Sequence, residues 1–495
     1  MSDVTPPTHL RHRIGDVWVA PRAGVVEIRN PADPNELVAT APYDDADAVP
    51  TAIASAREAL PGWSRLGAPS RGEFLFRAAE LLLDRASSIA RDLTREEGKT
   101  IGEATGEVRR AAAILRYFAG RTADRIGEVY PSAAPETRIQ TVREPIGVVA
   151  IVTPWNFPIA IPTWKIAPAL AYGNTVVFKP ASATPLTAQH LVEALVDAGL
   201  PAGVLNLVHV SGERFGRQWV AGSGVAGLSF TGSAPTGRRL ADQALGSGVK
   251  VQLELGGKNA VVVAADADLE LAADAIMRGA FASAGQKCTA TSRAIAVRDI
   301  AIPLREALVD RVSRLLPGNP LEPSTNLGPV IDLAARDRIA ALVAAARTDG
   351  ARIAGRSTAH EIEQIGAFAP ALVLDRVDPG ASIARDEVFG PVLVLLEADD
   401  LDQAIRIHND VAYGLSGSLF TRSLANADRF VRAARVGIVH VNGETAGAEP
   451  HVPFGGMKAS SSWSREQGHA AKDFYTQTKT VYWDGLADIG PFDLG

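Results

Sequence analysis

The sequence predicts an α/β fold built from doubly wound parallel sheets, and three observations lead to that prediction. Strand-like and helix-like segments alternate along most of the chain. Within residues 147–210 the order is strand, helix, strand, helix, strand, which is typical of a nucleotide-binding unit. The length of 495 residues, 46% of them hydrophobic, exceeds what one simple core needs, so we expect two or three domains.

The first half of the chain supplies most of these elements. Residues 46–120 carry apolar side chains at helical spacing and are expected to be mostly helical. Residues 137–143 alternate polar and apolar side chains, as a half-exposed antiparallel strand does. The nucleotide-binding unit then follows as strand 147–152, helix 162–171, strand 174–178, helix 185–198 and strand 204–210.

The second half repeats the alternation without an internal sequence repeat. We expect a strand over 294–297, a helix over 302–316 and a final strand over 476–483. The final strand alternates as an edge strand does, and its unpaired backbone groups are suited to pairing with another chain.

Composition excludes several classes of function. A net charge of −6 and a pI of about 5.9 provide no broad basic surface, so a nucleic-acid partner is not expected. The N-terminus lacks a basic and then apolar signal, and no apolar run approaches about 18 residues, so neither secretion nor a membrane span is expected. One cysteine fits a reducing cytoplasm, and nine scattered histidines indicate no metal site.

The single cysteine, Cys288, is the first candidate for chemistry. It stands in the small-residue stretch Gly-Gln-Lys-Cys-Thr, although a lone cysteine is more often a small apolar core residue. Upstream, Glu254 ends an apolar strand directly before two glycines. That glutamate is either a catalytic carboxylate or an ion-paired residue beside a turn.

Seven segments in a fixed order carry a family resemblance. They are residues 153–158, 178–182, 230–237, the segments around Glu254 and Cys288, 387–391, and 453–456. Each is weak alone, but together they resemble the aldehyde dehydrogenase superfamily over about residues 20–482.

The resemblance implies an aldehyde dehydrogenase-like fold with two doubly wound α/β domains and a small antiparallel oligomerisation element. The cofactor-binding domain would comprise residues 1–126 and 145–255, and the catalytic domain residues 256–472. The oligomerisation element would combine residues 127–144 and 473–495, which implies a homodimer or homotetramer.

Three catalytic residues follow from the resemblance. Cys288 is similar to the family nucleophile, whose thiolate attacks the aldehyde carbonyl. The Asn156 carboxamide is expected to donate to the oxyanion, with a turn residue as the alternative reading. Glu254 resembles the general base that activates water for thioester hydrolysis. Members that transfer the acyl group to coenzyme A generally lack this glutamate, so a free carboxylate product is implied.

Cofactor-binding residues are carried over in the same way. Gly232 and Ser233 form a turn suited to a pyrophosphate. Lys179 matches a contact to the adenosine ribose, and Glu387 one to the nicotinamide ribose. The remaining candidates are Thr153, Trp155 and Phe389, of which Trp155 could equally be core packing.

Ser182 bears on the choice between NAD and NADP. Family members that strongly prefer NAD often have glutamate here, which repels a 2′-phosphate. Serine removes that repulsion and Lys179 is nearby in sequence, so NADP or NAD is the expected cofactor; a turn-capping role for Ser182 is the alternative.

The substrate class is inferred from finer resemblances. Succinic semialdehyde dehydrogenases often have arginines where this chain has Trp164 and Ala282. Residues 158–170 and 441–456 instead resemble α-ketoglutaric semialdehyde (2,5-dioxopentanoate) dehydrogenases. Arg293 is read as a contact to an anionic substrate or as a structural salt bridge, and His451 as a tunnel residue or a loop histidine satisfied by backbone.

The expected reaction is therefore oxidation of a small-molecule aldehyde, 2,5-dioxopentanoate, to a carboxylate. The same chemistry on succinate semialdehyde, glutarate semialdehyde, or an aromatic or aliphatic aldehyde is the first alternative. A non-catalytic binding protein that reuses the fold is the second, and Cys288, Glu254 and Asn156 weigh against it.

Overall fold

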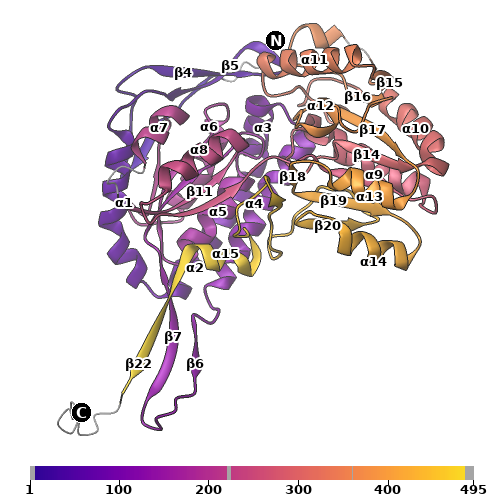
Figure 1. Ribbon diagram of the computed structural model, residues 1–495. Helices are drawn as coiled ribbons and strands as arrows, with labels where there is room; N and C mark the ends of the chain where they lie inside the picture. The colour runs from indigo at the N-terminus through magenta and orange to yellow at the C-terminus, as the bar shows by residue number, and fades with distance from the viewer. Residues whose placement is uncertain (1–5, 220–223, 359–360, 485–495) are drawn as a thin grey trace.

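The computed structural model describes residues 6–219, 224–358 and 361–484. The predicted domain limits therefore include residues outside this range, among them 485–495 of the predicted oligomerisation element. In Figure 1 two large α/β units lie side by side, and a narrow three-stranded sheet projects from one of them.

The first unit is centred on a seven-stranded sheet of order β12-β11-β8-β9-β10-β2-β3. Its parallel strands are β8 (Val148–Val152), β9 (Thr175–Lys179), β10 (Leu205–Leu207), β11 (Val225–Thr231) and β12 (Lys250–Glu254). Strands β2 (His12–Ile14) and β3 (Val17–Val19) extend it antiparallel. Helices α5 (Ala160–Ala171) and α6 (Pro185–Asp197) connect its strands.

This unit confirms the predicted nucleotide-binding order, with one difference. The strand predicted over 204–210 spans only Leu205–Leu207. Its partner β9 ends at Lys179, directly before Pro180, which has no backbone N–H to continue the ladder. Beyond the Val208 N–H bond to the Phe178 carbonyl (2.9 Å), the chain therefore leaves the sheet.

The strand order of this sheet reverses at β8. Strands β9 and β10 lie on one side of β8, and β11 and β12 on the other. Loops at the carboxyl ends of β8 and β11 diverge there, which is where open α/β sheets bind ligands. Asn156 follows β8, and Gly232 follows β11.

The second unit is centred on another seven-stranded sheet, of order β15-β16-β17-β14-β13-β19-β20. Six strands are parallel: β13 (Ala260–Val263), β14 (Arg293–Val297), β16 (Leu372–Asp375), β17 (Val392–Ala398), β19 (Ser416–Phe420) and β20 (Ile438–Val441). Strand β15 (Arg352–Arg356) is antiparallel. Its helices include α9 (Leu269–Phe281), α10 (Arg298–Ser313), α11 (Leu333–Thr348), α13 (Leu401–Asn409) and α14 (Leu424–Ala433).

Helix α10 starts earlier than the predicted 302–316. It begins at Arg298, directly after β14, and contains Pro303 in its second turn. A proline so near the start removes only one helical hydrogen bond, so the helix does not need to begin beside it.

The helices predicted over 46–120 are α1 (Ala48–Arg65), α2 (Ala68–Asp84), α3 (Ala86–Glu97) and α4 (Ile101–Arg121). Helix α4 starts with a capping box, in which the Thr100 side chain accepts from the Glu103 N–H and the Glu103 carboxylate accepts from the Thr100 N–H. It packs against α2, α3 and α5, so its first turns lie close to the loop that follows β8.

The projecting sheet has the order β22-β7-β6, with all strands antiparallel. It comprises β6 (Gly127–Tyr130), β7 (Arg138–Pro145) and β22 (Thr476–Trp483), and β22 is an edge strand as predicted. Figure 1 shows these strands extending well beyond the two units. Helices of the described residues are each too short or too polar to cross a bilayer.

No strands were predicted from the sequence within residues 8–42. Besides β2 and β3, this segment forms β1 (Thr8–His9), β4 (Val25–Asn30) and β5 (Asp33–Pro42), a small sheet of order β1-β5-β4. Leu10, Val38 and Leu186 of α6 share its small core, which fixes this sheet against the first unit.

Candidate active site

A cavity of about 270 Å³ lies between the two units and contains most of the predicted site residues. Its lining includes Trp155, Asn156, Gly232, Ser233, Cys288, Glu387 and Phe389. The loops after β8 and β11 supply the first four, and the second unit supplies the rest. One cavity is thus lined by the predicted nucleophile, the predicted oxyanion donor, four of the predicted cofactor contacts and Trp155.

Cys288 follows a strained turn. Ser283, Ala284 and Gly285 all adopt positive φ angles of 53°, 50° and 70°. Two of these are not glycine, so the surrounding structure must hold them in this conformation. Glu103 of α4 contributes, because its Oε1 accepts from the Ser283 N–H at 2.6 Å.

The environment of Cys288 keeps its thiol protonated. Burial, and then the charges of Glu387 and Glu254, raise the pKa of the Cys288 thiol to about 12. The sequence left this pKa open. At neutral pH the residue therefore needs a base, or a positive charge brought by a ligand, to become a nucleophile.

Asn156 is buried, with 3% of its surface exposed, and reaches the loop that carries Cys288. Its Nδ2 donates to the Gln286 carbonyl at 2.8 Å. A carboxamide nitrogen has two N–H groups, so one remains for a ligand in the cavity. Asn156 is therefore a linker between the two units as well as a wall of the cavity.

Glu254 lies behind the cavity wall, where the next two residues, Leu255 and Gly256, line the cavity. Its Oε2 accepts from Ser461 Oγ at 2.5 Å, whereas its buried Oε1 has no hydrogen-bond partner among the described residues. Burial, and then the nearby Glu466, raise the pKa of Glu254 well above its ordinary value. A carboxylate with a raised pKa and a free oxygen is suited to accept a proton near neutral pH.

Comparisons with known proteins agree on one family. Residues 18–481 match the Aldehyde dehydrogenase family. The chain belongs to the aldehyde dehydrogenase family. It is 42% identical to the alpha-ketoglutaric semialdehyde dehydrogenase of Bacillus subtilis (strain 168), over 97% of this chain and 99% of that protein. The alpha-ketoglutarate semialdehyde dehydrogenase of Haloferax volcanii is also 42% identical, over 95% and 98%.

Solved structures agree with the family in fold. The betaine aldehyde dehydrogenase of Staphylococcus aureus in complex with NAD+ superposes with a TM-score of 0.94 at 32% identity, covering 98% of this chain and 96% of that chain. The predicted aldehyde dehydrogenase-like fold and enzyme class are therefore confirmed. The roles of the individual site residues in this aldehyde dehydrogenase stay predictions.

In this aldehyde dehydrogenase, the geometry of one end of the cavity, the cofactor end, is suited to a dinucleotide. Gly232 and Ser233 precede α8 (Ala234–Ala244), whose N-terminus faces the cavity and favours an anion. Thr153 and Thr231, at the ends of β8 and β11, each have a buried hydroxyl that finds no partner within the part of the chain that the structure describes. A Cβ on Gly256 would lie 2.3 Å from Glu387 Oε2, so any residue other than glycine would overlap with the Glu387 carboxylate in this position.

Glu387 and Phe389 are fixed at this end by the backbone. Glu387 Oε1 accepts from the Gly257 N–H at 3.0 Å. Phe389 has a positive φ of 53°, and its ring meets Trp155 edge-on with 5.5 Å between ring centroids. Trp155 was read as either core packing or a cofactor contact, and it lines the cavity.

Three predicted cofactor residues do not line this cavity: Thr153, Lys179 and Ser182. Lys179 is buried, its Nζ donates to the Pro180 carbonyl at 2.8 Å, and burial lowers its pKa to about 8. Ser182 is partly exposed three residues beyond β9. These residues lie along the carboxyl edge of the sheet, on the β9 side of the switch point.

Sequence reasoning missed a buried ion pair behind Glu254. Lys165 of α5 and Glu466 are in direct contact and both buried, and Lys165 also donates to Ser229 Oγ at 3.0 Å. Glu466 acts on the pKa of Glu254 and Lys165 opposes it. The sequence does contain a signal for this buried charge, because Lys165 is the one charged residue in the apolar helix Ala160–Ala171.

The structure shows where Arg293 and His451 lie. Arg293 is buried and donates to the carbonyls of Lys258, Ile407 and His408, and it does not line the cavity that holds Cys288; no salt bridge of Arg293 is seen among the described residues. Its role is to hold backbone segments of the second unit together. His451 is exposed and does not line the cavity that holds Cys288.

Proposed function

We propose that this aldehyde dehydrogenase oxidises 2,5-dioxopentanoate to 2-oxoglutarate with NADP or NAD, through a covalent intermediate on Cys288. The observation that carries the reaction is one cavity lined by Cys288, Asn156, Glu387 and the Gly232–Ser233 turn. The observation that carries the substrate is the 42% identity to two proteins named for α-ketoglutarate semialdehyde.

The first step forms a thiohemiacetal. Cys288 Sγ attacks the aldehyde carbon, its proton passes to a base, and the carbonyl oxygen becomes an oxyanion. Glu254 is the nearby carboxylate whose raised pKa suits that transfer, and it releases this proton to solvent before the thioester is hydrolysed. The free N–H of Asn156 stabilises the oxyanion, since a donor fixed before the reaction stabilises developing charge most effectively.

A bound nicotinamide cofactor supplies the hydride acceptor that converts the thiohemiacetal into a thioester. On the protein side, the α8 N-terminus and the Gly232–Ser233 turn would hold the pyrophosphate, and the Glu387 carboxylate would hold a ribose hydroxyl. The rings of Phe389 and Trp155, in edge-on contact, line this end of the cavity.

The last step hydrolyses the thioester. Glu254 takes a proton from water, the hydroxide adds to the thioester carbon, and the Cys288 thiolate leaves with the electron pair of the C–S bond. The carboxylate product departs, and the thiolate regains a proton. Glu254 then returns its proton to solvent. In the buried pair beside it, Lys165 favours the charged form of Glu254, and Glu466 disfavours that form more strongly.

A substrate panel tests the substrate assignment. Initial rates of NAD(P)H formation are measured with 2,5-dioxopentanoate, succinate semialdehyde, glutarate semialdehyde and benzaldehyde, each with NAD and with NADP. We expect the highest kcat/KM with 2,5-dioxopentanoate. A competitor that exceeds it by about tenfold, or 1.4 kcal/mol in transition-state binding, contradicts the substrate but not the reaction class.

We further propose a cytoplasmic homodimer or homotetramer. The edge strand β22 leaves one row of backbone groups free for pairing with a second copy, and Tyr482 and Trp483 are exposed there. Analytical ultracentrifugation measures the assembly. A monomer at micromolar concentration would contradict this proposal without affecting the chemistry.

A further inference from the structure

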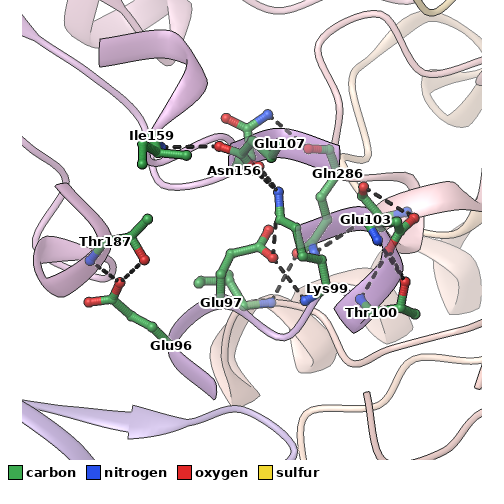
Figure 2. Close-up of polar contacts among 12 residues, drawn as sticks. Glu96, Glu97, Lys99, Thr100, Glu103, Glu107, Asn156, Ile159, Thr187 and Gln286 are labelled. Carbon is green, nitrogen blue, oxygen red and sulfur yellow. Dashed lines mark hydrogen bonds and ion pairs between the residues drawn. The ribbon is translucent and has the colours of Figure 1, made fainter. Parts of the chain in front are cut away.

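A buried group of charges lies beside the active site but outside the cavity, around the start of α4. Lys99 and Glu107 form an ion pair with 2.6 Å between Nζ and Oε2, and both side chains are 1% exposed. Lys99 Nζ also donates to the Asn156 carbonyl at 2.7 Å. Figure 2 shows the ammonium between these two acceptors.

The partner carboxylate holds the next turn of the same loop. Glu107 Oε1 accepts from the N–H groups of Ile159 and Ala160, each at 3.1 Å. The Lys99 ammonium lies 4.4 Å from the centre of the Phe157 ring. Lys99 and Glu107 therefore contact almost every residue from Asn156 to the start of α5.

The charges in this group balance as one pair. Glu97 lies 3.9 Å from Lys99, but burial raises the pKa of Glu97 to about 8, so it is mostly protonated at neutral pH. Glu107 is then the counter-ion of Lys99. A lysine held in this way has a fixed position, because a buried ion pair has few alternative partners.

We propose that Lys99 is a positioning residue for the reaction: held by Glu107, it fixes the Asn156 backbone so that the free carboxamide N–H points into the cavity beside Cys288. This inference rests on the oxyanion role proposed for Asn156. Two anchors define the position of that side chain, Lys99 at its own carbonyl and the Gln286 carbonyl at its Nδ2. Without the first anchor, the residue keeps only a side-chain contact.

The same helix supplies a matched control. Glu103, one turn before Glu107, accepts from the Ser283 N–H and so supports the loop of Cys288 rather than that of Asn156. Figure 2 shows both carboxylates on α4, one on each branch of the network. Substitution of Glu103 should disturb Cys288 without acting through Asn156.

A double-mutant cycle tests the proposal in the full-length enzyme. Single-turnover rates of NAD(P)H formation are measured for wild type, Asn156→Ala, Lys99→Met and the double variant. We expect a loss of about 100-fold for Asn156→Ala, as for other single oxyanion donors. Lys99→Met should slow the wild type about tenfold, leave the cofactor KM within about twofold, and slow Asn156→Ala by no more than about twofold.

The outcomes separate this inference from the proposed function. An unchanged rate in Asn156→Ala contradicts the oxyanion role itself. A slow Asn156→Ala, together with an equal Lys99→Met effect in both backgrounds, overturns only the positioning role. Glu103→Gln should slow the wild type and Asn156→Ala by the same factor. If Glu103→Gln instead couples to Asn156→Ala as strongly as Lys99→Met does, the network is only a structural support and the positioning role of Lys99 is overturned.

A second variant covers the case in which Lys99→Met does not fold. Lys99→Met/Glu107→Gln removes both charges together, so no buried carboxylate is left without its partner. The amide oxygen that replaces the Glu107 carboxylate oxygen can still accept from the α5 N–H groups. The same coupling to Asn156→Ala is expected for this variant, and its absence overturns the proposal.

Discussion

The two ends of the cavity are built differently. At the reaction end, three residues depend on polar partners that are distant in sequence. Glu103 supports the turn before Cys288, Lys99 and Gln286 hold Asn156, and Ser461 donates to Glu254. At the cofactor end, backbone groups do most of the positioning: Gly232 and Ser233 form the turn before α8, the Glu387 carboxylate accepts from the Gly257 N–H, and Phe389 has a positive φ. The comparison indicates that changes at the reaction end cost rate, and changes at the cofactor end cost affinity.

The largest expected effect is at Cys288. Cys288→Ala removes the nucleophile, so kcat should fall by at least about four orders of magnitude, as for other catalytic nucleophiles. The dissociation constant for NAD(P), followed by protein fluorescence, should stay within about twofold because the cofactor end is unchanged. Retained turnover in this variant would contradict the role of Cys288 as the nucleophile.

Glu254→Gln should have the next largest effect. Loss of a general base lowers the steady-state rate by about 10²-fold to 10⁴-fold, and the thioester should accumulate on Cys288. Intact-protein mass spectrometry after mixing with aldehyde and cofactor measures the adduct. A normal steady-state rate, or a slow variant with no adduct, speaks against a role in hydrolysis.

Glu387→Gln sharpens the contrast from the cofactor end. A charged hydrogen bond to a ribose hydroxyl contributes about 1.5 kcal/mol or more, so the cofactor KM should rise about tenfold with a smaller change in kcat. Steady-state kinetics at saturating aldehyde give both constants. A fall in kcat at unchanged KM would place Glu387 with the reaction end instead.

The ion pair behind Glu254 predicts two opposite pH shifts. Glu254 acts as a base only when deprotonated, so the rate rises with pH through its pKa. The Lys165 charge lowers the pKa of Glu254 and the Glu466 charge raises it. Lys165→Met should therefore move the acidic limb of the kcat profile upward by about one pH unit, and Glu466→Gln should move it downward. Shifts in the same direction would show that the pair does not act through Glu254.

The smallest expected effect is on coenzyme choice. Ser182→Glu places a carboxylate where a 2′-phosphate is expected, so kcat/KM for NADP should fall about fivefold while that for NAD is nearly unchanged. Ser182→Gln is the uncharged control of the same size. Equal losses with both coenzymes would indicate a general disturbance of the loop after β9.

Much of this architecture was predictable from the sequence, because it depends on local pattern. Alternating strands and helices predicted the parallel sheet, and the family resemblance predicted Asn156 and Gly232 as site residues, which both line the cavity. Partners of buried charges were not predictable in the same way. Lys165 and Glu466 are 301 residues apart, and the apolar helix around Lys165 signals a buried charge without saying which carboxylate meets it.

The burial of the charged residues around the start of α4 was likewise not predictable from the sequence. Lys99, Glu103 and Glu107 read as ordinary charges of a surface helix, although Lys99 and Glu107 are buried. Their burial arises because α4 packs against α5 and its first turns face the loops of both units. The projecting sheet was predictable as an antiparallel edge, whereas what pairs with β22 depends on a second chain.

The most direct test of the account is the pre-steady-state burst of NAD(P)H on mixing enzyme with saturating 2,5-dioxopentanoate and cofactor. Wild type should give a burst stoichiometric with active sites, followed by fast turnover. Glu254→Gln should give a burst of the same amplitude that forms more slowly, because this variant also lacks the proposed base for the Cys288 proton, followed by slow turnover. Cys288→Ala should give no burst. A stoichiometric burst in Cys288→Ala, or its absence from both other proteins with every aldehyde of the panel, would contradict covalent oxidation at this cavity.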